Sequence, residues 1–568
     1  MPTIASRARS CLGAALFLFA LGSGPAAFAQ SGRAYFLPDN LLLSRVVYDD
    51  KRSNVVVGMQ LPPGCAPANC VSATTDGTYP YVWNNAQVDG SFGITAKIIL
   101  DQLTPSGIPI NSLEVPNSSQ KGVPSTRDQM VTSFSSKSEL ALDLSTDGQS
   151  VTFMGYLAPV DALDVSNGNT PGVVDPTNPV PGINYRVVAQ IDAKGKLRFT
   201  ATNAYSGNNG RAAILNAFDG VLYAAGNAGN GGNPQPNGVI LGAGAQILTP
   251  QVNPLVAQSP GLPAPVGSFN ITELGDAPDK IGKDTNFRGL TIFNNVVYYT
   301  KGSGGNGVNT VYFVDTSGSD SNGSPSACPA GTGLPSASAS LPAAPVQYDP
   351  SVLQTKGVFP YNMCVLNGFP TALSSTTAFP FGVWFADAKT LYVADEGNGT
   401  NAFDPTAGKY TAAAAQTTAG LQKWIFDASL GAWKQAYVLQ AGLDLGVPYT
   451  VDDYPTGVNP RTGLPWSPAS DGLRNLTGRV NRDGTVSIWA ITSTVSGNGD
   501  QGADPNKLVM ITDKLAATSL PAGETFSTLR TARFAEVLRG VSLTPGTGVS
   551  CESRTSDESC EDHDNHDN

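Results

Sequence analysis

Histidine is almost absent from this chain. There are two among 568 residues, His563 and His566, and both lie in the last six positions. The rest of the chain therefore lacks the side chain that usually activates a serine or cysteine nucleophile, and the commonest protein ligand of transition metals. This excludes a Ser-His-Asp or Cys-His hydrolase and leaves carboxylates, arginines and backbone groups as the sources of chemistry.

Charged residues are also scarce, at 14%, and the formal net charge is -11. No basic stripe is present of the kind that displaces counterions from nucleic acid, so we do not expect a nucleic-acid partner. The segment 551–568 holds seven acidic residues and one arginine. Its composition predicts a solvated, disordered tail, and weak binding of divalent cations is the alternative.

No segment is apolar over the roughly 20 residues that a membrane-spanning helix needs. The N-terminus instead has the three parts of a signal peptide. These are Arg7 and Arg9, an apolar run over residues 12–21, and the small-x-small sequence of residues 27–29. We therefore predict that residues 1–29 are removed on export and that the mature protein is secreted, periplasmic or at the cell surface. A membrane anchor is the weaker alternative, because the run is too short.

Cysteine is rare and forms no CxxC motif. Outside the predicted signal peptide the cysteines fall into three local pairs, Cys65 with Cys70, Cys328 with Cys364, and Cys551 with Cys560. An even number in an oxidising compartment is most simply explained by disulfides, although spacing does not fix which cysteines pair. Metal binding by these thiols is the alternative.

Long stretches with the 3.6-residue period of an amphipathic helix are missing, so helix is expected to be a minor component. Short runs rich in Val, Ile, Tyr and Phe alternate with turn clusters, which is typical of many short antiparallel strands. Copies of one unit begin near Arg211, Arg288, Gly382 and Leu476, and residues 139–156 form a fainter copy. Each copy contains four strands, the content of a propeller blade.

The two ends of the repeat region look like parts of one further unit. Residues 539–544 repeat the opening of the unit and stop, whereas the N-terminal part supplies a strand at 42–48 and a hairpin at 98–115. Joining them closes the ring and leaves no unprotected sheet edge. We predict an all-β fold, a single β-propeller over residues 30–550 closed by its N- and C-terminal segments. It has six four-stranded blades, or seven if residues 317–374 contain another.

The segment TLYVADEGN, residues 390–398, resembles the repeat core of secreted NHL-type and lactonase-like β-propellers. Residues 295–301 and 220–227 are looser versions of it. The resemblance implies a radial propeller whose binding site lies on the face where loops converge on the central channel. Enzymes of that family often use histidine or a dense carboxylate cluster there, and this chain departs from them, so the resemblance implies an architecture and no particular activity.

Arginine recurs just before the innermost strand of the unit, at Arg211, Arg288 and Arg539, with Arg474 or Arg479 as a fourth. In a closed ring these side chains would converge near the axis. A guanidinium group pairs bidentately with a carboxylate or phosphate, so the pattern favours an anionic ligand. The alternative is that each arginine bonds to the next blade and staples the ring.

A Gly/Asn loop follows the second strand of each unit and contributes Asn227, Asn306 and Asn398 as further candidate ligand-binding residues. Their amides can bind sugar hydroxyls. The alternative is that they simply form tight turns, because Gly and Asn dominate turns in general.

Carboxylates supply the remaining candidates. Calcium takes about six to eight oxygen ligands, so we consider Asp276, Asp279, Asp284, Asp500 and Asp504 as candidate calcium ligands, although none has EF-hand spacing. Acid–base chemistry in a hydrolase or lyase would need a pair from Asp284, Asp395 and Glu396.

The leading functional hypothesis is an extracytoplasmic β-propeller that binds an anionic small molecule, a glycan or a protein on its loop-rich channel face. The alternative is a calcium-dependent hydrolase, lactonase or lyase that acts on a phosphoester or uronate. A redox quinoprotein ranks third.

Overall fold

The chain folds as a nearly all-β protein. The computed structural model describes residues 35–49, 55–61, 71–81, 93–133, 139–163, 165, 184–202, 205, 209–218, 220–227, 244–250, 266–272, 286–302, 307–314, 335, 361–372, 377–498 and 502–548. The one helix in these residues is the short α2 (Thr411–Ala414). None of the described helical structure is long and apolar enough to cross a bilayer. The predicted signal peptide and acidic tail lie outside the described residues.

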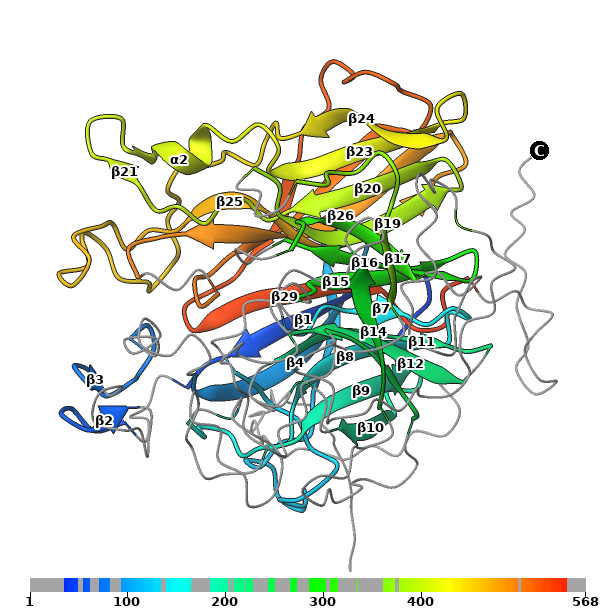
Figure 1. The fold of residues 1–568 in the computed structure, drawn as a ribbon. Coiled ribbons are helices and arrows are strands. Elements are labelled where there is room, and N and C mark those ends of the chain that lie inside the picture. The colour runs from blue at the N-terminus through cyan, green and yellow to red at the C-terminus, as the bar shows by residue number, and fades with distance from the viewer. Residues whose placement is uncertain are drawn as a thin grey trace, which may run out of the picture.

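The strands form six blades around a ring (Figure 1). Blade 1 contains β29 (Glu536–Leu543), β1 (Leu41–Val47), β4 (Thr95–Leu103) and β5 (Pro109–Glu114), with β6 (Thr132–Ser133) paired to β4. Blade 2 contains β7 (Asp143–Leu144), β8 (Ser150–Tyr156), β9 (Arg186–Asp192) and β10 (Leu197–Thr202). Blade 3 contains β11 (Gly210–Asn216), β12 (Val221–Gly226), β13 (Ala245–Leu248) and β14 (Val266–Thr272).

The other three blades have the same order from the axis outward. Blade 4 contains β15 (Gly289–Phe293), β16 (Val296–Lys301), β17 (Thr310–Val314) and β18 (Tyr361–Val365). Blade 5 contains β19 (Pro380–Asp387), β20 (Thr390–Asp395), β23 (Gly420–Asp427) and β24 (Ala432–Leu439). Blade 6 contains β25 (Ala469–Val480), β26 (Thr485–Val495), β27 (Lys507–Lys514) and β28 (Ser527–Thr531). Two small hairpins, β2 (Gln60–Leu61) with β3 (Val71–Ser72) and β21 (Phe403–Asp404) with β22 (Lys409–Tyr410), lie in loops.

Blade 1 closes the ring with strands from both ends of the chain. β1 and β29 run antiparallel side by side, with Leu41 opposite Leu543 and Val47 opposite Glu536 (Figure 1). The predicted closure by the N- and C-terminal segments is therefore confirmed. Six is the correct number of blades, and the seven-blade alternative is wrong. The strand that the structure describes within residues 317–374 is β18, which pairs with β17 as the outer strand of blade 4.

The innermost strands β29, β7, β11, β15, β19 and β25 contact one another in turn. Glycines let them approach closely. A Cβ atom on Gly289 would collide with the carbonyl oxygen of Phe381 in the next blade, and one on Gly540 would collide with that of Leu140. Larger residues at these two positions would push neighbouring blades apart.

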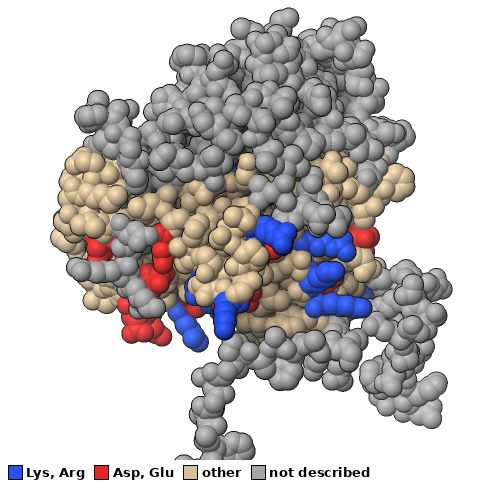
Figure 2. Space-filling view, turned by 90° about the horizontal axis from the view of Figure 1, so that it is seen from below, with Lys and Arg blue, Asp and Glu red and all other residues tan. Residues whose placement is uncertain are grey.

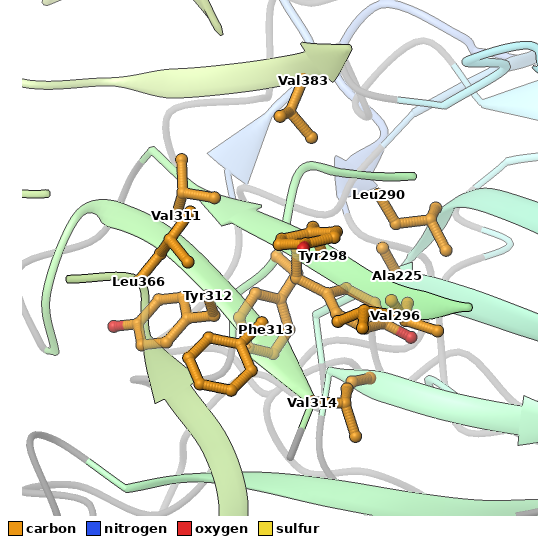
Figure 3. Close-up of a cluster of buried hydrophobic side chains, with 14 of the residues drawn as sticks. Ala225, Leu290, Val296, Tyr298, Val311, Tyr312, Phe313, Val314, Leu366 and Val383 are labelled. Atoms are coloured by element: carbon orange, nitrogen blue, oxygen red, sulfur yellow. The ribbon is translucent and has the colours of Figure 1, made fainter. Parts of the chain in front are cut away.

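Apolar side chains fill the spaces between blades. Figure 3 shows part of the largest described cluster, in which Tyr298, Tyr312 and Phe313 of blade 4 lie among valines and leucines, with Val383 contributed by blade 5. Phe293 and Phe385 stack across the same interface, with ring centroids 4.6 Å apart. Each such side chain contributes about 1.5–3 kcal/mol on burial, so apolar packing holds the blades together.

Candidate functional site

Four of the predicted arginines come together near the axis of the ring, on the innermost strands or directly before one of them. Arg211 lies in β11, Arg288 directly before β15, Arg474 in β25 and Arg539 in β29. Each is between 3% and 6% exposed. We call these four residues the channel-mouth cluster. Of the two candidates for the fourth arginine, the structure favours Arg474, because Arg479 lies over the ring of Trp489 instead, 5.8 Å from its centroid.

The guanidinium groups of the cluster are close enough to repel one another. Burial lowers the pKa of Arg211 well below its usual value, and the charge of Arg288 lowers it further. Burial also lowers the pKa of Arg474, and Arg539 and Arg288 act in the same direction against the attraction of Glu396. The cluster thus holds several like charges in a poorly solvated space.

Glu396 neutralises part of this charge. It follows β20 in blade 5 and lies between arginines of the two flanking blades. Arg474 Nε donates a hydrogen bond to Glu396 Oε2 at 3.2 Å, and Arg288 Nε lies 3.7 Å from Glu396 Oε1. Arg288 and Arg474 therefore connect neighbouring blades, which is the structural alternative for the repeated arginines. The carboxylate of Glu396 joins blades 4, 5 and 6.

Arg211 is held differently, by neutral acceptors of the next blade. Its Nη1 donates to the carbonyl oxygen of Phe287 at 2.7 Å and to Oδ1 of Asn286. Its Nε has no hydrogen-bond partner among the residues that the structure describes. Arg539 Nη2 donates to the hydroxyl of Tyr48 at 3.2 Å.

Glu139 adds a second carboxylate, in the loop that leads into blade 2. Its Oε2 accepts hydrogen bonds from the Thr132 hydroxyl at 2.6 Å and the Ser133 N–H at 3.1 Å. Burial raises the pKa of Glu139 to about 7, against the opposing effects of these donors, the nearby Tyr156 hydroxyl and the charge of Arg539. A carboxyl group that exchanges its proton near neutral pH therefore lies beside the arginines.

Tyr156 and Arg186 extend the site into blade 2. Both side chains are fully buried, and the Arg186 guanidinium lies over the Tyr156 ring, 5.2 Å from its centroid. The sequence patterns did not single out Glu139, Tyr156 or Arg186 as site residues. Glu139 is the first residue of the faintest copy of the repeat, so its position in the sequence is only a weak indication of a site residue. Arg186 is the first residue of β9, the third strand of blade 2. No other unit has an arginine at this position, so the repeats do not point to it.

Arginines are concentrated in this site. Glu139 and Glu396 place negative charge beside them. Four buried arginines and two glutamates therefore lie close together. A buried charge is costly unless it is paired, so a buried cluster of arginines favours the binding of an anion.

Asp395 lies next to Glu396 but faces other partners. Its carboxylate accepts hydrogen bonds from the N–H of Phe379 at 2.8 Å, the N–H of Gly397 at 3.0 Å and Gln422 Nε2 at 3.1 Å. Burial raises the pKa of Asp395 to about 7, and the charges of Glu396 and Asp471 act in the same direction. These bonds anchor the loops around the channel mouth.

Asp504 and Asn398 bond to partners outside the cluster. Asp504 accepts hydrogen bonds from Tyr454 at 3.2 Å and Ser496 at 3.0 Å. Asn398 is exposed, and its Oδ1 accepts the N–H of Thr400 at 2.8 Å, which is a local turn. The following candidates lie outside the described residues: Asp276, Asp279, Asp284, Asp500 and Asn306.

Asn227 follows β12, and its N–H donates to the Asn209 carbonyl at 3.0 Å. Cys364 is buried in β18. The other cysteines of the predicted pairs lie outside the described residues, so the disulfides stay a prediction. In the described part of the chain, no group of three or more His, Cys, Asp and Glu side chains is placed to hold a metal ion.

No protein-family model matches the chain, and no curated protein matches it. Among solved structures it is similar to mutants of the Synechocystis apocarotenoid oxygenase. One match has 9% identity and a TM-score of 0.32, and covers 90% of this chain and 93% of the other. A second has 9% identity and a TM-score of 0.26, and covers 76% and 72%. The assignment of a six-bladed propeller rests on the strand pairing of this chain itself.

Proposed function

We propose that this protein is an extracytoplasmic binding propeller that holds the carboxylate or phosphate group of a ligand at the channel-mouth cluster. The observation that carries the proposal is that Arg211, Arg288, Arg474 and Arg539 are buried close together. In addition, Arg211 Nε has no hydrogen-bond partner among the described residues. Guanidinium groups suit oxyanions because their planar array of donors matches two oxygens at once.

Sequence features support the finer parts of the proposal. The predicted signal peptide and the paired cysteines are typical of an exported protein. The six-bladed ring fits the resemblance of residues 390–398 to secreted NHL-type and lactonase-like propellers. The ligand is then the anionic part of a small molecule, a glycan or a protein that reaches the loop-rich face.

The test is a titration of the purified protein with phosphate, citrate and glucuronate, followed by thermal unfolding. A ligand that binds only the folded state stabilises it by about 2.7 kcal/mol at a hundredfold excess over its Kd. We expect at least one of these anions to raise the midpoint of the wild-type protein. Arg211→Met should abolish that rise, since Arg211 has no carboxylate among its hydrogen-bond partners in the described structure.

The matched control is Arg479→Met, which removes an arginine from outside the cluster. This variant should keep the full anion-induced rise. Equal responses from both variants would show that anions act by non-specific charge screening, and no response in any of the three proteins would overturn the proposal.

An enzyme that acts on an anionic substrate is the second candidate. It is favoured by Glu139, whose pKa of about 7 suits proton transfer at neutral pH. Turnover of phosphoesters, lactones and uronates, each with calcium or with a chelator, tests this candidate. Activity that Glu139→Gln removes while anion binding survives would establish catalysis, and a chelator effect would add the proposed calcium requirement.

A further inference from the structure

A basic groove lies on blade 2, away from the channel-mouth cluster. It has a volume of about 280 Å³ and is formed by the turn between β7 and β8 and the turn between β9 and β10. Gln149 lines it from the first turn, and Lys194 and Lys196 line it from the second. We call it the basic groove.

The groove carries more positive than negative charge. Lys194, Lys196 and Arg198 are exposed and line it together with Asp192. The Asp192 carboxylate is turned into its own hairpin, where Oδ1 accepts the N–H groups of Lys194 and Lys196 at 2.9 Å each. Viewed from below, basic side chains gather on one part of the described surface, and most acidic ones lie elsewhere (Figure 2).

The C-terminal end of the propeller runs past this groove. After β29 the chain packs on the β7–β8 turn, where the Gly546 N–H donates to the Gly148 carbonyl at 2.7 Å. A Cβ atom on Gly546 would lie 3.6 Å from the Cβ of Ala193, which lines the groove. Gly548 is the last described residue. The C-terminal segment of the chain therefore starts next to the basic groove.

This C-terminal segment is the most acidic part of the sequence. Residues 551–568 contain seven carboxylates and one arginine, and the first carboxylate is Glu552. Four extended residues span at most about 14 Å, and this is the reach of Glu552 from Gly548.

We propose that the basic groove binds the acidic tail of the same chain, residues 551–568. Individual exposed ion pairs are weak, but the tail is tethered beside the groove, and a short tether gives an effective concentration in the millimolar range. Several weak pairs then suffice to hold it. Because the pairs are exposed, salt weakens them. This inference does not depend on ligand binding at the channel mouth.

Zero-length crosslinking of the full chain with a carbodiimide tests the proposal, because it joins a lysine amine to a carboxylate only when the two are in contact. We expect tail carboxylates to crosslink to Lys194 and Lys196 at least fivefold more often than to Lys121 and Lys409, which are exposed lysines elsewhere. The yield should fall by at least threefold in 1 M salt. Equal yields at all four lysines would overturn the proposal.

Arg198→Glu supplies a variant that leaves both reactive lysines in place. It should reduce the tail crosslinks at least threefold, whereas Arg482→Glu, the same charge change at an exposed arginine of blade 6, should not. A mixture of isotopically light and heavy protein identifies the chain that supplies the tail. Light-to-heavy crosslinks would overturn binding within one chain and indicate exchange of tails between copies.

Hydrogen exchange gives an independent measurement. Replacing the seven tail carboxylates by amides should speed exchange of the turn at residues 192–196 severalfold, and 1 M salt should do the same to the wild-type protein. If inorganic phosphate slows exchange at this turn and the tail has no effect, the groove is a site for external anions and the proposal is wrong.

Discussion

Two groups of buried charged side chains in this molecule differ in the partners that surround them. At the interface of blades 5 and 6, Lys423 and Asp513 are fully buried and lie 2.9 Å apart. At the channel mouth, four arginines share two glutamates. The first group centres on a single lysine, whereas the second gathers four arginines.

The Lys423–Asp513 pair has its hydrogen bonds satisfied within the fold. Lys423 Nζ also donates to the carbonyls of Lys514 at 2.7 Å and Leu515 at 2.9 Å. Asp513 accepts from the hydroxyls of Tyr392 and Tyr437 and shares a hydrogen bond with Glu524, whose pKa is raised to about 7 by burial and by Asp513. A buried pair whose donors and acceptors are satisfied has a structural role, and it leaves nothing for a ligand to complete.

The channel-mouth cluster shows the opposite arrangement. Arg211 Nε has no hydrogen-bond partner among the described residues, and four arginines are gathered there. An unsatisfied donor among clustered arginines, and not burial alone, therefore distinguishes the candidate binding site from the structural ion pair. Changing one charge at a time in each region tests this distinction.

Lys423→Met should have the largest effect. It leaves Asp513 buried without a cation, which typically costs about 3–5 kcal/mol. Urea unfolding at pH 7 measures the loss. Adding Asp513→Asn to Lys423→Met should restore part of it, because residue 513 then no longer carries a buried charge without its lysine. A single variant as stable as the wild type would show that this pair contributes little.

Glu139→Gln should change how stability depends on pH. The folded-state pKa of Glu139 is raised to about 7 from its usual value of 4.5, so between these values the folded protein binds a proton that the unfolded chain has lost. The wild-type protein should therefore lose stability as the pH rises from 4.5 to 7, by about 3 kcal/mol, and then level off.

The glutamine variant lacks this loss, so relative to the wild type it should gain about 3 kcal/mol between pH 4 and pH 8. Asp395, whose pKa is also raised to about 7, titrates in both proteins and cancels in the comparison. Parallel pH profiles for the two proteins would show that Glu139 is not buried in a charged form at pH 8.

Arg211→Met should have a smaller effect than Lys423→Met and the opposite sign. It removes a buried positive charge that Arg288 repels, at the cost of two hydrogen bonds to neutral acceptors, and we expect a net gain of about 1 kcal/mol without ligand. Urea unfolding in a buffer without phosphate or carboxylate measures it. A loss of 2 kcal/mol or more would identify Arg211 as a staple between blades 3 and 4.

Arg479→Met should have the smallest effect, a loss of about 0.5–1 kcal/mol, because the interaction it removes is a cation–π contact with Trp489. The same unfolding assay applies. A loss of stability as large as that of Lys423→Met would mean that the pairing of buried charges does not determine how much each variant changes the free energy of unfolding.

The repeat units could be recognised from sequence because the blade is a local structure. Alternating apolar residues and turn glycines specify each hairpin, and the arginine before the innermost strand marks its start. The number of blades was less certain, because it depends on which strands pair across long loops. β18 pairs with β17 across such a loop, and spacing alone does not show that pairing.

The candidate site could be predicted only in part. Three arginines were identified by their repetition, and Arg474 was one of two possibilities for the fourth. Glu139, Tyr156 and Arg186 were missed because each occurs once, and a residue that occurs once leaves no periodic signal. Asp504 and Asn398 were selected by type, but their hydrogen bonds are made away from the cluster.

The sequence by itself determined the all-β class, the four-strand unit and the recurrence of arginine, because these are properties of local periodicity. The closure of the ring could be predicted as well, because each chain end carries an incomplete copy of the unit. Only the tertiary structure decided which charges meet. Charge interactions depend on distance and burial, and both are set when blades that are far apart in the chain come together around one axis.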